Sequence, residues 1–181
     1  MEENLAFTKK RVVQILDALR QEYPEAGCAL EHKNKYELLI CVVLSAQTTD
    51  KSVNKISDAL FEKYPTPQAL AQAQQEDVID IIRTIGMYKT KSKNIIALAK
   101  GLVENYGGEV PGDYEELIQL PGVGRKTANV VLAEGFGQQK IAVDTHVFRV
   151  TNRIGFVKEK DVLKTELALM KVLPEDRWTE A

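Results

Sequence analysis

The chain has 181 residues, of which 44% are hydrophobic and 28% are charged, and its formal net charge is −2 at pH 7. This composition is that of a globular protein long enough to bury a core. No apolar run is long enough to cross a membrane, and the first residues lack the basic and apolar regions of a secretion signal. We therefore expect a cytoplasmic protein, in which Cys28 and Cys41 are reduced thiols without metal-ligand spacing.

The hydrophobic pattern is helical along almost the whole chain. Apolar residues three and four positions apart mark one face of a first helix and of a third, at Val12, Ile15, Leu16 and Leu19, then at Val53, Ile56, Leu60 and Phe61. Further helices are expected over Asp77–Thr84, Thr90–Tyr106, Arg125–Glu134, Asp144–Ile154 and Glu159–Val172.

Capping residues support these boundaries. Asn34 and Glu37 form a capping-box pattern before the apolar run Leu38–Leu44, Thr66–Pro67 reads as an N-cap followed by a proline, and Asp113 opens another capped helix. Periodicity alone also allows a buried strand over Leu38–Leu44. The cap, the length and the lack of any strand partner favour a buried helix, so the sequence predicts an all-α, multi-helix bundle.

Basic residues gather in one part of the chain despite the slightly negative total. Between Ile81 and Lys100 there are five basic residues and no acidic one. Such a local positive strip can serve phosphates, and the alternative is a solvated helix face. The segments Ile82–Ala97 and Ile118–Ala133 also resemble each other, which indicates either two helix–turn–helix units or a coincidence of helix-end chemistry.

The most specific run is Leu120–Ala128, which joins two predicted helices by a glycine-rich hairpin. Glycines at 122 and 124 allow a tight turn with exposed backbone N–H groups, and the N-terminus of the next helix adds further donors. Together they can bind a phosphate without reading a base. An ordinary glycine turn between antiparallel helices is the alternative.

Lys126 and Asp144 each begin a predicted helix. The positive end of the helix dipole and contact with Val130 favour a neutral amine at Lys126, and a neutral amine can form a Schiff base with a sugar carbon. Asp144 is a favoured N-cap, and an ionised carboxylate there can also stabilise a cationic sugar or move a proton. Spacing alone assigns neither role.

Four segments, in order along nearly the whole chain, resemble the endonuclease III family of DNA base-excision repair. They are Glu37–Asp50, Thr84–Tyr88, Leu120–Val131 and Ile141–Arg149. The resemblance implies a helix-hairpin-helix DNA glycosylase fold and a bifunctional enzyme on double-stranded DNA. Such an enzyme removes oxidised pyrimidines and cleaves abasic sites by β-elimination through a lysine Schiff base.

The resemblance also implies roles for single residues. Lys126 matches the Schiff-base lysine and Asp144 the catalytic aspartate, Gln47 matches the residue that fills the gap left by the flipped nucleotide, and Met87 stands where the family usually carries a leucine wedge. The residues expected to contact DNA are Gln47, Met87, Lys89, Lys91, Lys93, Leu120, Gly122, Val123, Gly124, Arg125, Thr145 and His146. A structural histidine is the alternative at position 146.

Within the wider superfamily, the related adenine glycosylases carry a catalytic glutamate on the helix that here reads Leu38–Leu44. This run contains no acid, and Val42 stands at about the matching place. Those enzymes also lack the lysine found here at position 126. The bifunctional interpretation is therefore preferred.

The chain departs from the family at its end. Most members continue with a four-cysteine [4Fe–4S] loop, whereas this chain ends at Ala181, and Cys28 and Cys41 cannot supply four thiolates. We expect no cluster and no metal in this chain, which is either truncated or a cluster-less variant. A monovalent cation on the carbonyl groups of the 120–125 hairpin is an optional partner.

The domain boundaries follow from the resemblance. A central bundle over residues 25–138 contains the helix-hairpin-helix at about 113–135, and residues 1–24 with 139–181 form a second, incomplete domain. We expect a monomer that binds DNA more weakly than the family does. We also expect less covered apolar surface that invites self-association, on the first helix and at Val162, Leu163, Leu167, Leu169 and Met170.

Two other functions remain open. The chain could be a helix-hairpin-helix module that binds DNA with little or no turnover. It could also be a monofunctional glycosylase, which releases a base but leaves the backbone intact until alkali is added.

Overall fold

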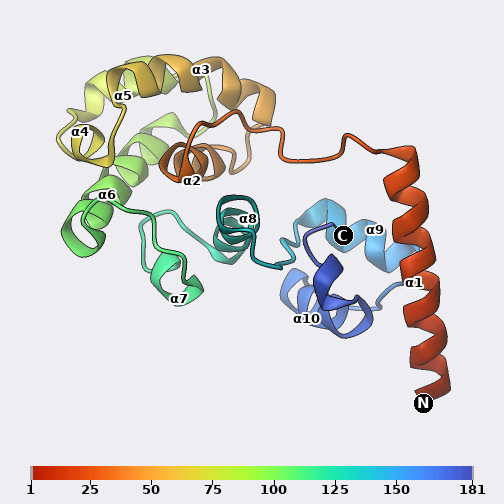
Figure 1. Ribbon diagram of the computed structural model, residues 1–181. Helices are drawn as coiled ribbons and strands as arrows, with labels where there is room; N and C mark the ends of the chain where they lie inside the picture. The colour runs from red at the N-terminus through yellow and green to blue at the C-terminus, as the bar shows by residue number, and fades with distance from the viewer. Residues whose placement is uncertain (1, 181) are drawn as a thin grey trace. The chain divides into compact units, whose positions relative to one another are not determined.

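The computed structural model of the protein describes residues 2–180, with side chains described from residue 9 onward. Every regular element within these residues is a helix: ten α-helices and one short 3₁₀-helix, with no strand among residues 2–180 (Figure 1). The predicted all-α fold class is therefore confirmed. None of the described helices combines the length and the apolar character that a bilayer span requires.

The described chain divides into two compact units. The first comprises residues 28–136, and the second comprises the described residues up to 27 together with those from 137 onward. Each unit has a hydrophobic core of its own.

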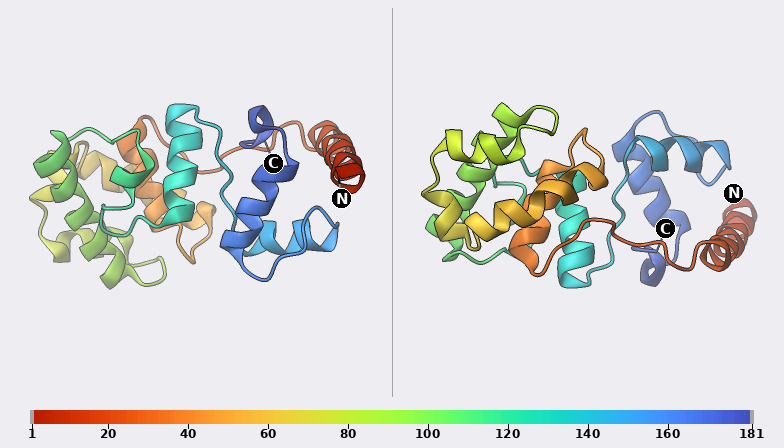
Figure 2. Two further views of the ribbon diagram at one scale, coloured as in Figure 1. Left: turned by 90° about the horizontal axis from the view of Figure 1, so that it is seen from below. Right: turned by 90° about the horizontal axis from the view of Figure 1, so that it is seen from above.

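Seven helices make up the unit of residues 28–136. They are α2 (Lys35–Leu44), α3 (Asp50–Lys63), α4 (Pro67–Ala71), α5 (Gln75–Ile82), α6 (Tyr88–Tyr106), α7 (Tyr114–Leu117) and α8 (Arg125–Phe136). Helix α2 packs against α3, α6 and α8, while α4 and α5 lie against α6 (Figure 2). Every residue from Leu38 to Leu44 is buried, so the apolar run forms the buried helix that the cap and the length favoured over a strand.

The predicted caps are present. The Asn34 side chain accepts a hydrogen bond from the Glu37 backbone N–H at 2.9 Å, and the Glu37 carboxylate accepts one from the Lys33 backbone N–H at 2.7 Å. Thr66 caps α4 and Asp113 caps α7 in the same way. These bonds satisfy backbone donors that the first helical turn leaves free.

Three helices begin two or more residues away from the predicted start. Helix α5 begins at Gln75 rather than Asp77, and α6 begins at Tyr88 rather than Thr90, directly after a left-handed residue. Helix α10 (Val162–Val172) begins later than Glu159, because Asp161 is its N-cap and accepts a hydrogen bond from the Lys164 N–H at 2.8 Å.

The second unit contains α1 (Glu2–Glu22), α9 (Thr145–Arg153), α10 and the 3₁₀-helix η1 (Glu175–Arg177). Its core joins Val12 and Leu16 of α1 to residues after α8 and on α10, among them Ile141, Phe156 and Leu169. On α10 itself the side chains of Val162, Leu163 and Leu167 are exposed, whereas Leu169 is buried and Met170 is half-buried. Three of the five side chains expected to be less covered are thus at the surface, and Leu169 is not because it faces this core.

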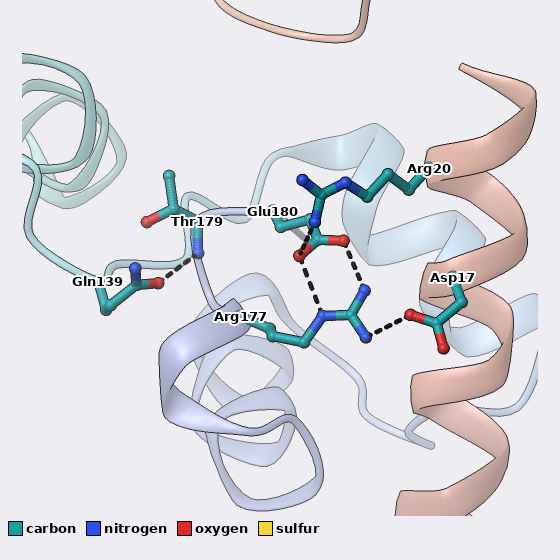
Figure 3. A network of polar contacts seen from close by, with 6 residues as sticks. All are labelled: Asp17, Arg20, Gln139, Arg177, Thr179 and Glu180. Atoms are coloured by element: carbon teal, nitrogen blue, oxygen red, sulfur yellow. Dashed lines mark hydrogen bonds and ion pairs between the residues drawn. The ribbon is translucent and has the colours of Figure 1, made fainter. Parts of the chain in front are cut away.

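Polar contacts hold η1 and the residues that follow it. Arg177 donates to Asp17 of α1 at 2.6 Å and to Glu180 through Nε at 3.0 Å. The Thr179 backbone N–H donates to Gln139 at 3.1 Å (Figure 3). Residues that are far apart in the sequence are therefore joined within this unit.

Candidate DNA-contacting site

The hairpin between α7 and α8 is compact and rests on the core of its unit. Its turn is closed by hydrogen bonds from the Val123 N–H to the Leu120 carbonyl at 3.1 Å and from the Ala128 N–H to the Gly124 carbonyl at 2.9 Å. Leu120 and Val123 are buried, and Leu120 approaches α6 closely at Gly101. Two apolar anchors thus hold the hairpin while the residues between and after them stay at the surface.

The two hairpin glycines serve different purposes. Gly122 has a φ of +81°, and a Cβ atom there would lie 3.3 Å from both Asn94 and Val43, so the turn needs glycine for conformation and for close packing. A Cβ atom at Gly124 would meet nothing within 4 Å. The backbone at Gly124, at the start of α8, therefore faces open space, as a phosphate contact requires.

Arg125 and Lys126 occupy the first turn of α8, and both are exposed. The Arg125 guanidinium donates to the Tyr114 hydroxyl at 3.2 Å and lies 5.4 Å from the centre of its ring. Lys126 is at the surface, and Val130 one turn further along is half-buried. The lysine amine is therefore reachable from solvent at the positive end of a helix.

Asp144 is the N-cap of α9. Its Oδ1 accepts hydrogen bonds from the backbone N–H groups of His146 at 2.8 Å and Val147 at 2.9 Å. Both bonds end on the same oxygen, so the cap leaves Oδ2 available for other contacts. Thr145 and His146 are exposed in the first turn of α9, and this exposure does not fit a packed structural histidine.

Gln47 and Met87 share an uncommon backbone conformation. Their φ angles are +54° and +58°, and within residues 2–180 they are the only non-glycine residues with positive φ. Gln47 lies in the turn between α2 and α3, and Met87 precedes α6 with 58% of its side chain exposed. Strained residues that persist at a surface are often part of a functional site.

The three lysines of the first turns of α6 divide into two kinds. Lys89 and Lys93 are exposed, as a phosphate contact requires, whereas Lys91 is only 4% exposed. Its ammonium donates to the Thr48 hydroxyl at 2.6 Å. The expected contact of Lys91 with the DNA backbone does not fit this burial. Residues two positions apart on a helix point to opposite faces, so Lys91 faces inward while Lys89 and Lys93 face solvent.

A cleft of about 600 Å³ also lies in this unit, away from all these residues. Its lining includes Glu31, Glu37, Asp58 and Glu62, with His32 and Lys33. This predominance of acids disfavours DNA phosphates, so the cleft is not the predicted site.

The chain matches the model of the HhH-GPD superfamily base excision DNA repair proteins over residues 40–175. It is 47% identical to endonuclease III of Bacillus subtilis over 171 residues, which cover 94% of this chain and 78% of that protein. It is also 47% identical to endonuclease III of Escherichia coli K12, covering 94% of this chain and 81% of the relative. The chain belongs to the endonuclease III family.

Solved structures agree with this assignment. The fold superposes with a TM-score of 0.90 on a trapped endonuclease III–DNA covalent intermediate, at 49% identity, covering 94% of this chain and 81% of that one. A non-covalent endonuclease III–DNA complex matches equally well, with a TM-score of 0.90. The predicted family is therefore confirmed, and with it a helical fold that belongs to DNA base excision repair.

The residues present do not fit the family's [4Fe–4S] cluster. Such a cluster takes four thiolates, and the chain has only Cys28, which is exposed, and Cys41, which is buried. No group of three or more histidine, cysteine or acidic side chains within the described residues could hold a metal ion.

The candidate residues fall in both units. Gln47, Met87 and Lys126 belong to residues 28–136, whereas Asp144 belongs to the second unit. Thr48 and Tyr114, which accept hydrogen bonds from Lys91 and Arg125, were not predicted from the sequence. The burial of Lys91 had a signal in the sequence, since Lys91 begins the stripe that continues at Ile95 and Leu98.

Proposed function

We propose that this protein is a bifunctional DNA glycosylase that removes oxidised pyrimidines from double-stranded DNA and then nicks the abasic site. The observation that carries this proposal is the exposed Lys126 amine at the start of α8, directly after the hairpin whose open Gly124 backbone can receive a phosphate. The backbone that can bind a phosphate and the proposed nucleophile thereby lie two residues apart in the chain.

In the proposed reaction the neutral Lys126 amine attacks C1′ of the damaged nucleotide. A nitrogen–carbon bond forms, the bond from C1′ to the base breaks, and the protonated base leaves. The sugar ring opens to a Schiff base, and loss of a proton from C2′ then expels the 3′ phosphate by β-elimination. Asp144 stabilises the positive charge that develops on the sugar and moves protons, for which Oδ2 is available.

The roles of the other candidate contacts rest on the family resemblance. Gln47 and Met87 replace the extruded nucleotide within the duplex. The exposed Lys89 and Lys93, together with Arg125, contact the phosphate backbone, and Thr145 and His146 lie beside Asp144 at the start of α9. The similarity to two solved endonuclease III–DNA complexes supports DNA as the partner.

The test is borohydride trapping on a duplex with one abasic site. Borohydride reduces the imine to a stable amine, so the wild-type protein is expected to cross-link to the DNA. Lys126→Gln and Lys126→Arg are both expected to lose the cross-link, while Lys126→Arg keeps a long basic side chain and retains DNA binding. Trapping of either variant at the wild-type level contradicts the role of the lysine.

Gel retardation and strand cleavage, on one duplex with an abasic site and one with a damaged base, separate the other two functions. Retardation of the duplex by wild-type protein without nicking favours a non-catalytic binding module. Release of the base with an intact backbone until alkali is added favours a monofunctional glycosylase.

A further inference from the structure

Lys91 occupies a position that a helix normally gives to an apolar residue. On α6 it begins the stripe of Lys91, Ile95, Leu98 and Leu102, all of which are buried. Residues four and three positions apart share one helix face, so Lys91 points into the unit and not toward solvent. An ammonium at such a place costs free energy through desolvation, and burial lowers its pKa. A buried lysine at a core position therefore requires a reason.

The ammonium has one partner among the described residues. It donates to the Thr48 hydroxyl at 2.6 Å, across 43 positions of sequence. Burial is the cause of the lowered pKa, and no acidic side chain opposes it by raising the pKa. The buried position of Lys91 is therefore not explained by a salt bridge. It is explained by the hydrogen bond to Thr48 in the turn between α2 and α3.

This contact joins the two turns that carry Gln47 and Met87. The Lys91 backbone N–H donates to the Met87 carbonyl at 2.9 Å, and Thr48 follows Gln47 directly. At Gly86 a Cβ atom would lie 3.9 Å from the Gln47 carbonyl oxygen and 4.0 Å from Thr48 Oγ1. The two turns therefore lie side by side, with one left-handed residue in each.

We propose that Lys91 is a positioning residue whose ammonium, through Thr48, fastens the Gln47 turn to the Met87 turn. The inference rests on the proposed function, since it concerns the two side chains that take the place of the extruded nucleotide. When the two turns are fixed, Gln47 and Met87 are already positioned to enter the DNA duplex. The turns then lose little conformational entropy when DNA binds. An apolar residue at position 91 would fill the same space without holding the second turn.

The first test needs no DNA. Lys91→Met and Thr48→Val each remove one partner with little change in volume, and amide hydrogen exchange reports on residues 45–49. Both variants are expected to exchange faster there than wild type, with melting temperatures equal to or above that of wild type for Lys91→Met, because a desolvated charge is gone. Unchanged exchange in both variants overturns the proposal, and so does a large loss of stability in Lys91→Met.

The second test compares two DNA duplexes in single turnover. One carries thymine glycol opposite adenine, and the other carries the same lesion opposite a tetrahydrofuran spacer, where no base pair must be broken. Both variants are expected to lose about tenfold or more in rate on the paired lesion and less than about threefold on the unpaired one. Equal losses of rate on the two duplexes contradict the positioning role of Lys91. Additive losses in the double variant Lys91→Met/Thr48→Val contradict it as well, because partners in one contact should not act independently.

Lys89→Met is the contrasting variant on the same helix. Its exposed ammonium is proposed to contact a phosphate, so this change is expected to weaken binding to both duplexes alike and to lower the salt dependence. Lys91→Met is expected to leave the salt dependence unchanged. If wild-type protein neither nicks nor traps DNA, the proposed function fails. Hydrogen exchange at residues 45–49 still tests whether Lys91 holds the Gln47 turn through Thr48.

Discussion

The Arg177 guanidinium and the Asp17 carboxylate lie 2.6 Å apart, from Nη1 to Oδ1, and join the segment after α10 to the middle of α1. Arg177 also donates to the Glu180 carboxylate through Nε and Nη2. Arg20 of α1 lies 3.9 Å from the Glu180 carboxylate. Only 16% of the Arg177 side chain is exposed. A network with a largely buried arginine and a bidentate contact to a carboxylate stabilises a fold more than a single surface ion pair does.

Arg177→Met is expected to lower the free energy of unfolding of the second unit by about 1 kcal/mol. The effect depends on pH, because the neighbouring guanidinium lowers the pKa of Glu180. A carboxyl whose pKa is lower in the folded state stabilises the fold above its ordinary pKa and loses that contribution as the pH falls through the folded value. Urea unfolding is expected to show a larger difference between wild type and variant at pH 7 than at pH 3.

The two hairpin glycines provide a matched pair of variants. Gly122→Ala places a side chain at a φ of +81° and against Asn94 and Val43, and is expected to destabilise the unit of residues 28–136 by about 1–2 kcal/mol. Gly124→Ala meets no atom within 4 Å and is expected to melt like wild type while binding DNA more weakly, since the added methyl group stands where a phosphate must approach. Thermal unfolding and gel retardation measure the two effects. Equal melting of both variants would contradict this division.

The sequence predicted the helices and their caps because capping chemistry is local. Asn34, Thr66, Asp113 and Asp144 each bind backbone groups within three residues, so short patterns are enough to find them. The family resemblance predicted the helix-hairpin-helix for the same reason, since its glycines and apolar anchors are consecutive in the chain.

Contacts between residues far apart in the sequence could not be predicted from such local patterns. Lys89, Lys91 and Lys93 read as one basic strip, although helical geometry separates Lys91 from the other two. Its partner Thr48 lies in another turn, and no local pattern indicates that contact. Likewise, nothing around Arg177 in the sequence points to Asp17. The roles of Lys126 and Asp144 came from resemblance, because a lysine and an aspartate at helix starts are common in proteins of every function.

The two cysteines are expected to differ in reactivity. Cys41 is buried, with its Sγ 3.8 Å from the Glu31 carbonyl oxygen, and burial raises the pKa of its thiol to about 12. Cys28 is exposed, and partial desolvation raises the pKa of its thiol more modestly. Because the thiolate is the reactive form, iodoacetamide is expected to modify Cys28 alone in the native protein, and faster at pH 9.5 than at pH 8. Mass spectrometry of the digested protein reads this out, and modification of Cys41 before unfolding would show that its site opens.

Asp144 combines a structural and a proposed chemical role that two substitutions separate. Asparagine caps a helix as well as aspartate does, so Asp144→Asn is expected to keep the hydrogen bonds to His146 and Val147 and to melt like wild type. Asp144→Ala loses the cap and is expected to cost about 1 kcal/mol of stability. Both variants lack the carboxylate and are expected to release a damaged base at least about a hundredfold more slowly than wild type. A stable Asp144→Asn protein with the wild-type rate would leave position 144 as a helix cap and nothing more.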